Sequence, residues 1–124
     1  MRSERAFKIK TPAGWKVIGK VMRIKGEWSF YREMYEPDHK FNTYNAWGLQ
    51  SILLPVLKQD GVKWLYQYEK KTKTMYRISL KDFEEKSIEQ DYGEGNQLFC
   101  STKYFKKINM KRINKWINSI ELVA

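Results

Sequence analysis

The stretch that decides the fold runs over Gly61–Phe83 and reads Gly-Val-Lys-Trp-Leu-Tyr-Gln-Tyr-Glu-Lys-Lys-Thr-Lys-Thr-Met-Tyr-Arg-Ile-Ser-Leu-Lys-Asp-Phe. Residues 62–68 are rich in aromatic and β-branched side chains, which favour a strand with two alternating faces. The basic segment 70–73 is typical of a solvated turn, and residues 75–78 have the composition of a returning strand. The pattern therefore predicts a central β-hairpin. The side chains expected in its core are Trp64, Tyr66 and Ile78.

A short helix is predicted directly after this hairpin. Ser79 occupies the position of an N-cap, and Asp82 follows three residues later, which is close to a capping box. Ile78 before the cap and Phe83 at the fourth helical position can form a hydrophobic staple. We therefore expect a helix over residues 80–86.

The first third of the chain predicts an antiparallel meander. Residues 7–10 alternate apolar and basic side chains, which indicates a short edge strand. Residues 15–25 and 28–35 are longer strand candidates, and Lys25-Gly26 between them is typical of a tight turn. We expect residues 1–6 to form a mobile basic tail.

The middle of the chain predicts a helix from about Ala46 to Leu57, because apolar residues recur there at i, i+3, i+4 and i+7. Pro55 removes a backbone donor, so a kink or an early end is expected near it. The apolar stripe consists of Leu49, Ile52, Leu53 and Val56.

The last third predicts a loop, a strand and helical segments. Residues 88–96 are acidic and rich in glycine, which indicates a loop, and residues 97–100 indicate a short inner strand. Residues 101–107 are expected to form a turn of helix, and Asn109 is placed to cap a second helix. The apolar stripe of that C-terminal helix comprises Met110, Ile113, Trp116, Ile117 and Ile120.

Together these segments predict an α+β fold in one domain, 1–124. It would contain an antiparallel or mixed sheet of about five to six strands. The middle helix and the C-terminal helix would pack on that sheet.

The charge of the chain is its most informative property for function. The sequence holds 24 Lys and Arg against 14 Asp and Glu, a formal net charge of +10. Such a field attracts polyanions, of which nucleic acid is the commonest in a cell. The single cysteine, Cys100, forms no disulfide within the chain, and no apolar run reaches the length of a membrane span. We therefore expect a cytoplasmic, reducing location and no membrane partner.

The leading hypothesis is non-catalytic binding of DNA or RNA through phosphate contacts, with no metal or other cofactor. Tyr31 and Tyr35 are the aromatic residues expected to stack on a single strand. The basic residues expected to meet phosphates are Lys8, Lys10, Lys16, Lys20, Arg23, Lys25, Lys70, Lys71, Lys73, Lys106, Lys107, Lys111 and Arg112.

The order of elements over residues 28–83 resembles part of the restriction-endonuclease-like domains, which include Holliday-junction resolvases. That resemblance implies a nuclease that binds Mg²⁺ with an Asp and a Glu-x-Lys motif. Glu33 matches the glutamate of that motif, but Tyr35 occupies the lysine position, and a literal Glu-Lys-Lys stands at 69–71. As a nuclease, the chain would use Glu33, Glu69 and Lys71, with Mg²⁺ as its cofactor.

Two further alternatives remain open. A basic face can instead dock an acidic protein, in which case a sizeable apolar patch is expected on the surface. A metal-independent ribonuclease needs only basic residues with a Tyr or His. The residues available for that chemistry are Tyr31, Tyr35, His39 and Lys40.

Overall fold

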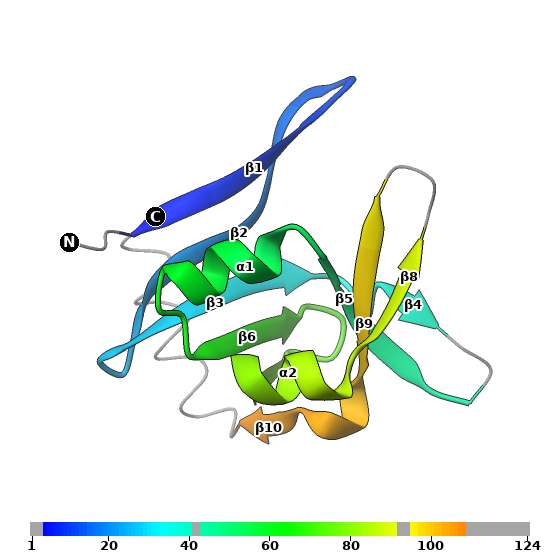
Figure 1. Ribbon diagram of the computed structural model, residues 1–124. Coiled ribbons are helices and arrows are strands. Elements are labelled where there is room, and N and C mark those ends of the chain that lie inside the picture. Colours follow the sequence, from blue (N-terminus) through cyan, green and yellow to red (C-terminus); the bar gives the residue numbers. More distant parts are fainter. Residues whose placement is uncertain (1–3, 41–42, 92–94, 109–124) are drawn as a thin grey trace.

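The computed structural model describes residues 4–40, 43–91 and 95–108 (Figure 1). This part of the chain is a mixed α+β fold with a six-stranded mixed sheet and a four-stranded antiparallel sheet. The first sheet has the order β1 (Arg5–Thr11), β2 (Gly14–Ile24), β3 (Glu27–Met34), β6 (Trp64–Glu69), β7 (Thr74–Ser79) and β10 (Lys106–Ile108). The second has the order β4 (His39–Lys40), β5 (Asn45–Gln50), β9 (Asn96–Ser101) and β8 (Ile88–Asp91). The helices are α1 (Leu53–Gln59), α2 (Leu80–Lys86) and a single 3₁₀ turn, η1 (Thr102–Tyr104).

The predicted central hairpin is confirmed as β6 and β7, which pair in an antiparallel register from Trp64↔Ser79 to Glu69↔Thr74. Strand β6 is buried on both faces. Its Leu65 packs into one apolar cluster and its Tyr66 into another on the opposite side of the sheet. A strand covered on both sides shows little apolar-polar alternation, and the run from Leu65 to Gln67 is buried throughout.

The helix after the hairpin is also confirmed. The hydroxyl of Ser79 accepts a hydrogen bond of 3.1 Å from the backbone N–H of Asp82, so the N-cap forms as the sequence predicts. Ile78 and Phe83 both lie in the larger apolar cluster. The tight turn between β2 and β3 is confirmed as well, since Lys25 and Gly26 both have positive φ, as a two-residue hairpin loop of type I′ requires.

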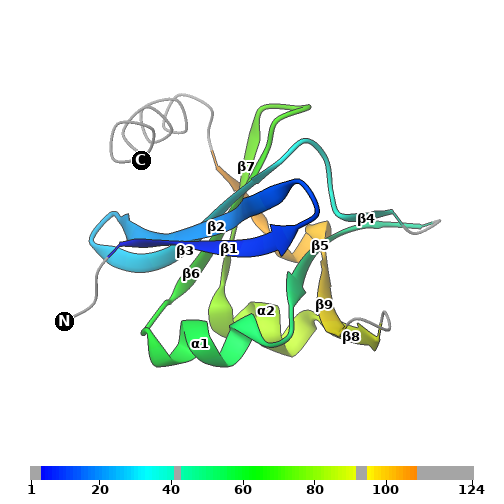
Figure 2. The same cartoon turned by 90° about the horizontal axis from the view of Figure 1, so that it is seen from above.

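The pairing of β3 with β6 is parallel, over Ser29↔Trp64 to Met34↔Glu69. Parallel neighbours need a crossover connection, and residues 35–63 supply it with β4, β5 and α1. The crossover places β5 and α1 over one face of the large sheet (Figures 1 and 2). Trp47 of β5 and Leu57 of α1 are fully buried in the larger cluster on that face.

The predicted helix over residues 46–57 is wrong in its first half. Residues 45–50 form β5, and α1 begins only at Leu53. The run from Ala46 to Leu49 is buried at every position, so its apolar spacing fits a helix and a doubly covered strand equally well. Because α1 begins only at Leu53, Pro55 lies in its first turn. The missing N–H of a proline costs no intrahelical hydrogen bond there, so neither a kink nor an early end is needed.

Three other segments differ from expectation. Residues 88–91 of the predicted loop form β8, which pairs with β9 as the edge of the second sheet. The predicted helical turn over 101–107 shortens to η1, and Lys106–Ile108 adds β10 to the large sheet beside β7. Strand β1 begins at Arg5, inside the predicted tail. The predicted inner strand at 97–100 is confirmed within β9, whereas the predicted C-terminal helix lies outside the described residues.

Gly19 is a close-packed position where β2 crosses the core. A Cβ atom at this residue would lie only 2.3 Å from Cζ of Phe30, whose ring packs over the glycine. Phe7 of β1 meets the same ring edge-on, with centroids 5.7 Å apart. The aromatic pair therefore depends on the missing side chain.

We predict that Gly19→Ala lowers the free energy of unfolding by about 1–3 kcal/mol, because the Phe30 ring must move to admit the methyl group. Urea unfolding measures the loss. In a Phe30→Leu background the same substitution should cost clearly less, since the obstructing ring atoms are gone. An equal loss in both backgrounds would show that Phe30 is not the cause.

Candidate nucleic-acid interface

Strands β1 and β2 extend beyond the core as a two-stranded ribbon (Figures 1 and 2). A β-bulge between Phe7 and Lys8 separates the ribbon from the packed part of the hairpin, with Ile18 as the extra residue on β2. Before the bulge, Phe7 packs on the core. Bulges bend and twist a hairpin, and this one marks the point where the strands leave the core.

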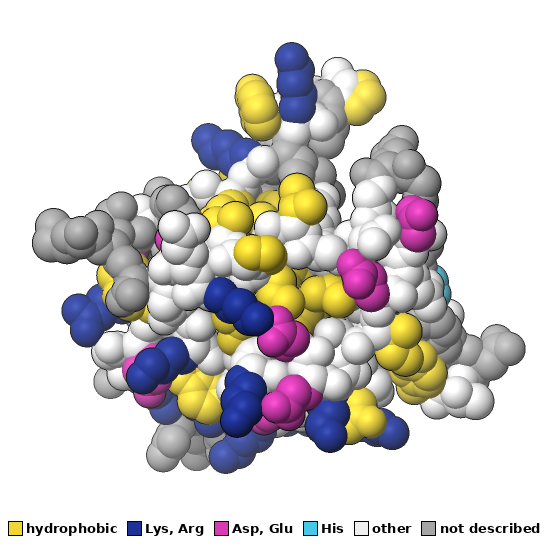
Figure 3. Space-filling model, in the orientation of Figure 1, with side chains coloured by type: hydrophobic (Ala, Val, Ile, Leu, Met, Phe, Trp, Pro, Cys, Tyr) yellow, Lys and Arg dark blue, Asp and Glu magenta, His cyan; other side chains and the backbone are white. Residues whose placement is uncertain are grey.

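Beyond the bulge, one face of the ribbon combines cations with apolar side chains. The register pairs Lys8 with Val17 and Lys10 with Trp15, and directly opposed residues of an antiparallel pair share a face. We call these four residues the ribbon face. Trp15 is 69% exposed and Val17 is 48% exposed, and both lysines are exposed. Figure 3 shows Lys or Arg side chains beside hydrophobic ones on this projection.

No acid interrupts this segment. Residues 5–26 contain seven basic residues and no Asp or Glu, and neither Lys8 nor Lys10 has an ion-pair partner within the described ranges. Arg23 is exposed at the other end of β2, where it donates to the carbonyl of Gly26 at 3.0 Å and lies over the Trp28 ring. The structure thus leaves Lys8 and Lys10 available to an anion. Of the other residues predicted from this segment, Lys16 lies in β2 by its backbone, Lys20 is half-buried, and Lys25 lies in the tight turn.

The lysines of the β6–β7 turn are partly engaged. Lys70 lies 3.4 Å from Glu33, and Lys71 lies 3.4 Å from Glu36. Hydrogen bonds from Lys40 and then Lys71 lower the pKa of Glu36. Lys73 is exposed and has no acidic partner within the part of the chain that the structure describes.

The predicted basic residues of the last third are placed only in part. Lys106 and Lys107 are exposed on β10, and the ammonium group of Lys107 lies 5.9 Å from the centroid of the Tyr76 ring. These two lie at the opposite edge of the large sheet from β1. The predicted contacts Lys111 and Arg112 lie outside the described residues.

The two tyrosines proposed for stacking have different environments. Tyr31 is only 4% exposed, and its hydroxyl donates a 2.6 Å hydrogen bond to Glu33, so the expectation that its ring meets a base is wrong. The ring packs into the smaller apolar cluster, on the face of β3 opposite Phe30. Tyr35 is 64% exposed. Trp15, which the sequence analysis did not select, is the most exposed aromatic side chain within the described ranges.

The carboxylates required by a metal-dependent nuclease do not converge. Glu69 pairs in register with Met34, so it lies on the opposite face of the sheet from Glu33. Glu69 is buried and accepts a 2.6 Å hydrogen bond from Thr72. Lys71, the third residue of that set, contacts Glu36 instead. Within the described residues no three His, Cys, Asp or Glu side chains gather as a metal site, and these residues do not fit the Mg²⁺ site that the resemblance implies.

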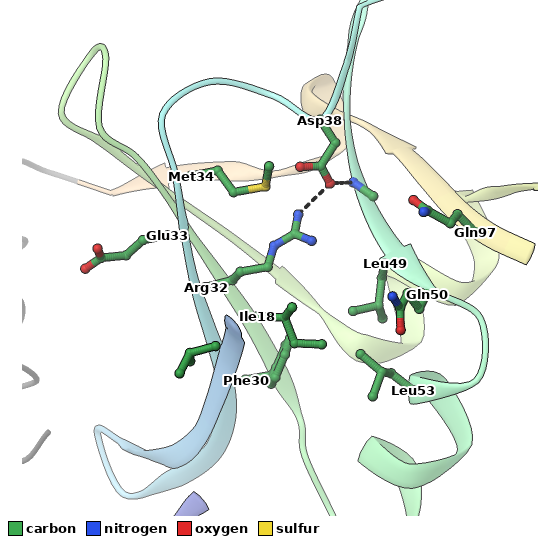
Figure 4. A pocket seen from close by; sticks show the side chains of 12 residues that line it. Ile18, Phe30, Arg32, Glu33, Met34, Asp38, Leu49, Gln50, Leu53 and Gln97 are labelled. Atoms are coloured by element: carbon green, nitrogen blue, oxygen red, sulfur yellow. Dashed lines mark hydrogen bonds and ion pairs between the residues drawn. The ribbon is translucent and has the colours of Figure 1, made fainter. Parts of the chain in front are cut away.

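A half-open pocket of about 320 Å³ lies where the ribbon joins the body, between β2 and β3 on one side and β5, β9 and α1 on the other (Figure 4). Its floor carries an ion pair, with Nη2 of Arg32 2.8 Å from Oδ2 of Asp38. Nε of Arg32 also donates to Oε1 of Gln67 at 2.7 Å. The guanidinium is therefore held from two sides in one orientation.

Gly48 completes this arrangement. Its backbone N–H donates a 2.6 Å hydrogen bond to the same Oδ2 of Asp38, and a Cβ atom there would lie 2.8 Å from that oxygen. The other oxygen, Oδ1, is buried and has no hydrogen-bond partner within the described ranges. The sequence analysis missed this site because Arg32, Asp38 and Gly48 belong to three different segments, and the crossover alone brings them together.

Two other groups have shifted ionisation. Burial, with a smaller contribution from Asp82, raises the pKa of Cys100 to about 12, so this buried thiol is poorly suited to act as a nucleophile. Burial also raises the pKa of Tyr76, and the nearby Glu69 adds to the shift. No helix among the described residues has the length and apolar character to cross a membrane.

Comparison with known proteins does not assign this chain to a family. No family model matches the sequence, and no curated protein matches it. Among solved structures, that of D212, a nuclease from a fusselovirus, is similar over 82% of this chain and 67% of that chain, with 12% sequence identity and a TM-score of 0.49. A likeness at this level carries no argument about the fold or the function of this chain.

We predict that Asp38→Asn lowers the free energy of unfolding by about 1–3 kcal/mol, because it leaves a largely buried guanidinium without its counter-ion. Urea unfolding provides the measurement. Glu36→Gln is the control, since it removes a carboxylate with two cationic partners at an exposed position and should cost much less. Losses of equal size would contradict the importance of the buried pair.

We also predict that the thiol of Cys100 resists thiol–disulfide exchange in the folded protein. At pH 8 a thiol with a pKa of about 12 is ionised in on the order of one molecule in ten thousand, and the side chain is fully buried. Reaction with a chromogenic disulfide reagent should be negligible in buffer and complete in denaturant. Rapid reaction in buffer would show that β9 opens readily.

Proposed function

We propose that this protein binds nucleic acid without cutting it, and that the ribbon face makes the principal contact. The observation that carries the proposal is the combination of Lys8 and Lys10 with the exposed ring of Trp15 on one face of a projecting ribbon. Lysines supply phosphate contacts, and an exposed aromatic ring supplies a stacking surface for bases. The net charge of +10 supports an anionic partner.

The shape of the ribbon also supports this function. A two-stranded β-ribbon is narrow enough to enter the major groove of DNA, and an exposed ring can equally stack on the bases of a single strand. The bulge at Phe7/Lys8 carries the ribbon face away from the core, and Figure 1 shows the ribbon standing clear of the rest of the molecule. A partner can therefore reach Lys8, Lys10 and Trp15 without moving any other helix or strand that the structure describes.

Lysines outside the ribbon face are expected to contribute less to nucleic-acid binding. Lys73 on the β6–β7 turn and Lys106 on β10 are exposed and have no acidic partner within the described ranges. Lys70 and Lys71 already contact Glu33 and Glu36, so a phosphate must compete with those carboxylates. We therefore rank these positions below the ribbon face, whose lysines need no such exchange.

A second candidate function is the docking of an acidic protein. The observation that favours it is an apolar patch on α1, where Ile52 is 75% exposed and Val56 lies on the same side one turn later. Hydrophobic side chains lie across the face that Figure 3 presents. A protein partner would cover this patch and would bind without any nucleic acid present.

We predict that Lys8→Ala/Lys10→Ala weakens nucleic-acid binding and lowers the slope of log affinity against log salt by about 2, one for each lost phosphate contact. Fluorescence anisotropy of labelled single-stranded and double-stranded DNA and RNA, between about 50 and 200 mM salt, measures both effects. The matched control is Lys81→Ala/Lys86→Ala, which removes the same charge from α2, away from the ribbon (Figure 1).

An unchanged slope in the ribbon variant, or an equal change in the control, would overturn the assignment to the ribbon face. Intact strands after incubation with Mg²⁺ are expected, whereas Mg²⁺-dependent cleavage would contradict the non-catalytic part of the proposal. If no nucleic acid binds at low salt, the acidic-protein alternative replaces it.

A further inference from the structure

The pocket at Arg32 lies beside the ribbon face, and Val17 belongs to both. A strand that contacts Lys8 and Trp15 therefore passes the rim of this pocket. The opposite wall comes from α1 and from β5 and β9, which Figure 4 shows at the far side of the Arg32–Asp38 pair. The pocket is thus placed to receive a group that the bound strand presents.

The lining has the chemistry of a site for a flat, uncharged, heteroaromatic group. Ile18, Phe30, Leu49 and Leu53 supply apolar walls, as the faces of a nucleobase require. Gln50 and Gln97 face each other in register on β5 and β9, and their side-chain amides have no hydrogen-bond partner within the described residues. Each amide offers donors and an acceptor, which complement the polar edge of a base.

The charges of the pocket disfavour a phosphate inside it. Among the described residues that line it, Arg32 is the cation, and it is already paired with Asp38, so a phosphate would have to compete with that carboxylate. The volume of about 320 Å³ lies near the lower end of the range for small-molecule sites. A base fits these limits, while its phosphates remain outside with the lysines of the ribbon.

From these observations we infer that the pocket takes a single unpaired nucleobase from a strand that lies on the ribbon face. This inference rests on the proposed function and deepens it. It means that the protein prefers nucleic acid with unpaired or extrahelical bases over a perfect duplex, since a paired base cannot enter without loss of its stacking and pairing. The two glutamine amides read the edge of the base, and the Arg32–Asp38 pair shapes the floor.

The test compares three duplexes of one sequence: fully paired, with one bulged base, and with one bulged abasic residue. Anisotropy gives the affinity of each for the unaltered protein, for Gln50→Leu/Gln97→Leu and for Lys8→Ala/Lys10→Ala. We expect the unaltered protein to prefer the bulged base over the abasic bulge by on the order of tenfold, the value of one or two hydrogen bonds together with apolar burial. The glutamine variant should lose this preference and keep its affinity for the abasic duplex.

The lysine variant should weaken all three complexes alike, because phosphates are common to them. Lysine-dependent binding without any preference for the bulged base would overturn the pocket inference and leave the proposed function standing. Failure of every duplex to bind at low salt would instead defeat the proposed function itself. Leu53→Phe, which fills the pocket from α1, is the second variant if the glutamine substitutions reduce stability.

A titration with free nucleosides tests whether the pocket binds a base on its own or only a base that a bound strand presents. Free nucleosides are titrated into the protein, and the methyl NMR signals of Leu49 and Leu53 are followed. These signals should shift and saturate in the unaltered protein. In the Leu53→Phe variant, the Leu49 signals should not shift. Shifts of that kind support a base site that free nucleosides can also occupy. Absence of shifts together with equal affinity for bulged-base and abasic duplexes would overturn the inference.

Discussion

The parallel pairing of β3 with β6 is the constraint on which the rest of the structure depends. It joins two antiparallel hairpins, β2–β3 and β6–β7, into one sheet and forces residues 35–63 to cross a face of that sheet. The crossover carries β5 and α1, and β5 recruits β9 and β8 into the second sheet. Burial of Trp47 and Leu57 in one cluster with Phe30 and Leu65 follows from this strand pairing, and Phe83 of α2 joins the same cluster.

The same pairing places β3 and β6 at the centre of the large sheet and leaves β1 at its edge. Most side chains in the middle of β3 and β6 are buried in the two apolar clusters, one on each face of the sheet. β1 lies at the edge, and beyond the bulge the described side chains of β1, Lys8 and Lys10, are exposed. Exposed edges of sheets are commonly protected by lysine, so Lys8 and Lys10 also oppose edge-to-edge aggregation. The ring of Trp15 has no such protective role, and a binding function accounts for it better.

Local chemistry was predictable from the sequence, whereas long-range pairing was not. The Ser79 cap and the Lys25-Gly26 turn are determined within a few residues, and both form as expected. β5 was predicted to be helical because burial on both faces leaves no alternation to read. Tyr31 was expected to meet a base because the sequence does not show that β3 is buried on both faces, with Phe30 in the larger cluster and Tyr31 in the smaller one. The pocket was not predictable from the sequence either, since Arg32 and Gly48 are brought together at Asp38 only by the crossover of residues 35–63.

Lysine acetylation footprinting with and without bound nucleic acid tests the central claim most directly, because it reports every accessible lysine of the intact protein at once. The account predicts that Lys8 and Lys10 are protected in the complex while Lys81 and Lys86 on α2 react as in the free protein. Unchanged reactivity of Lys8 and Lys10 under conditions where the strand is bound would contradict it.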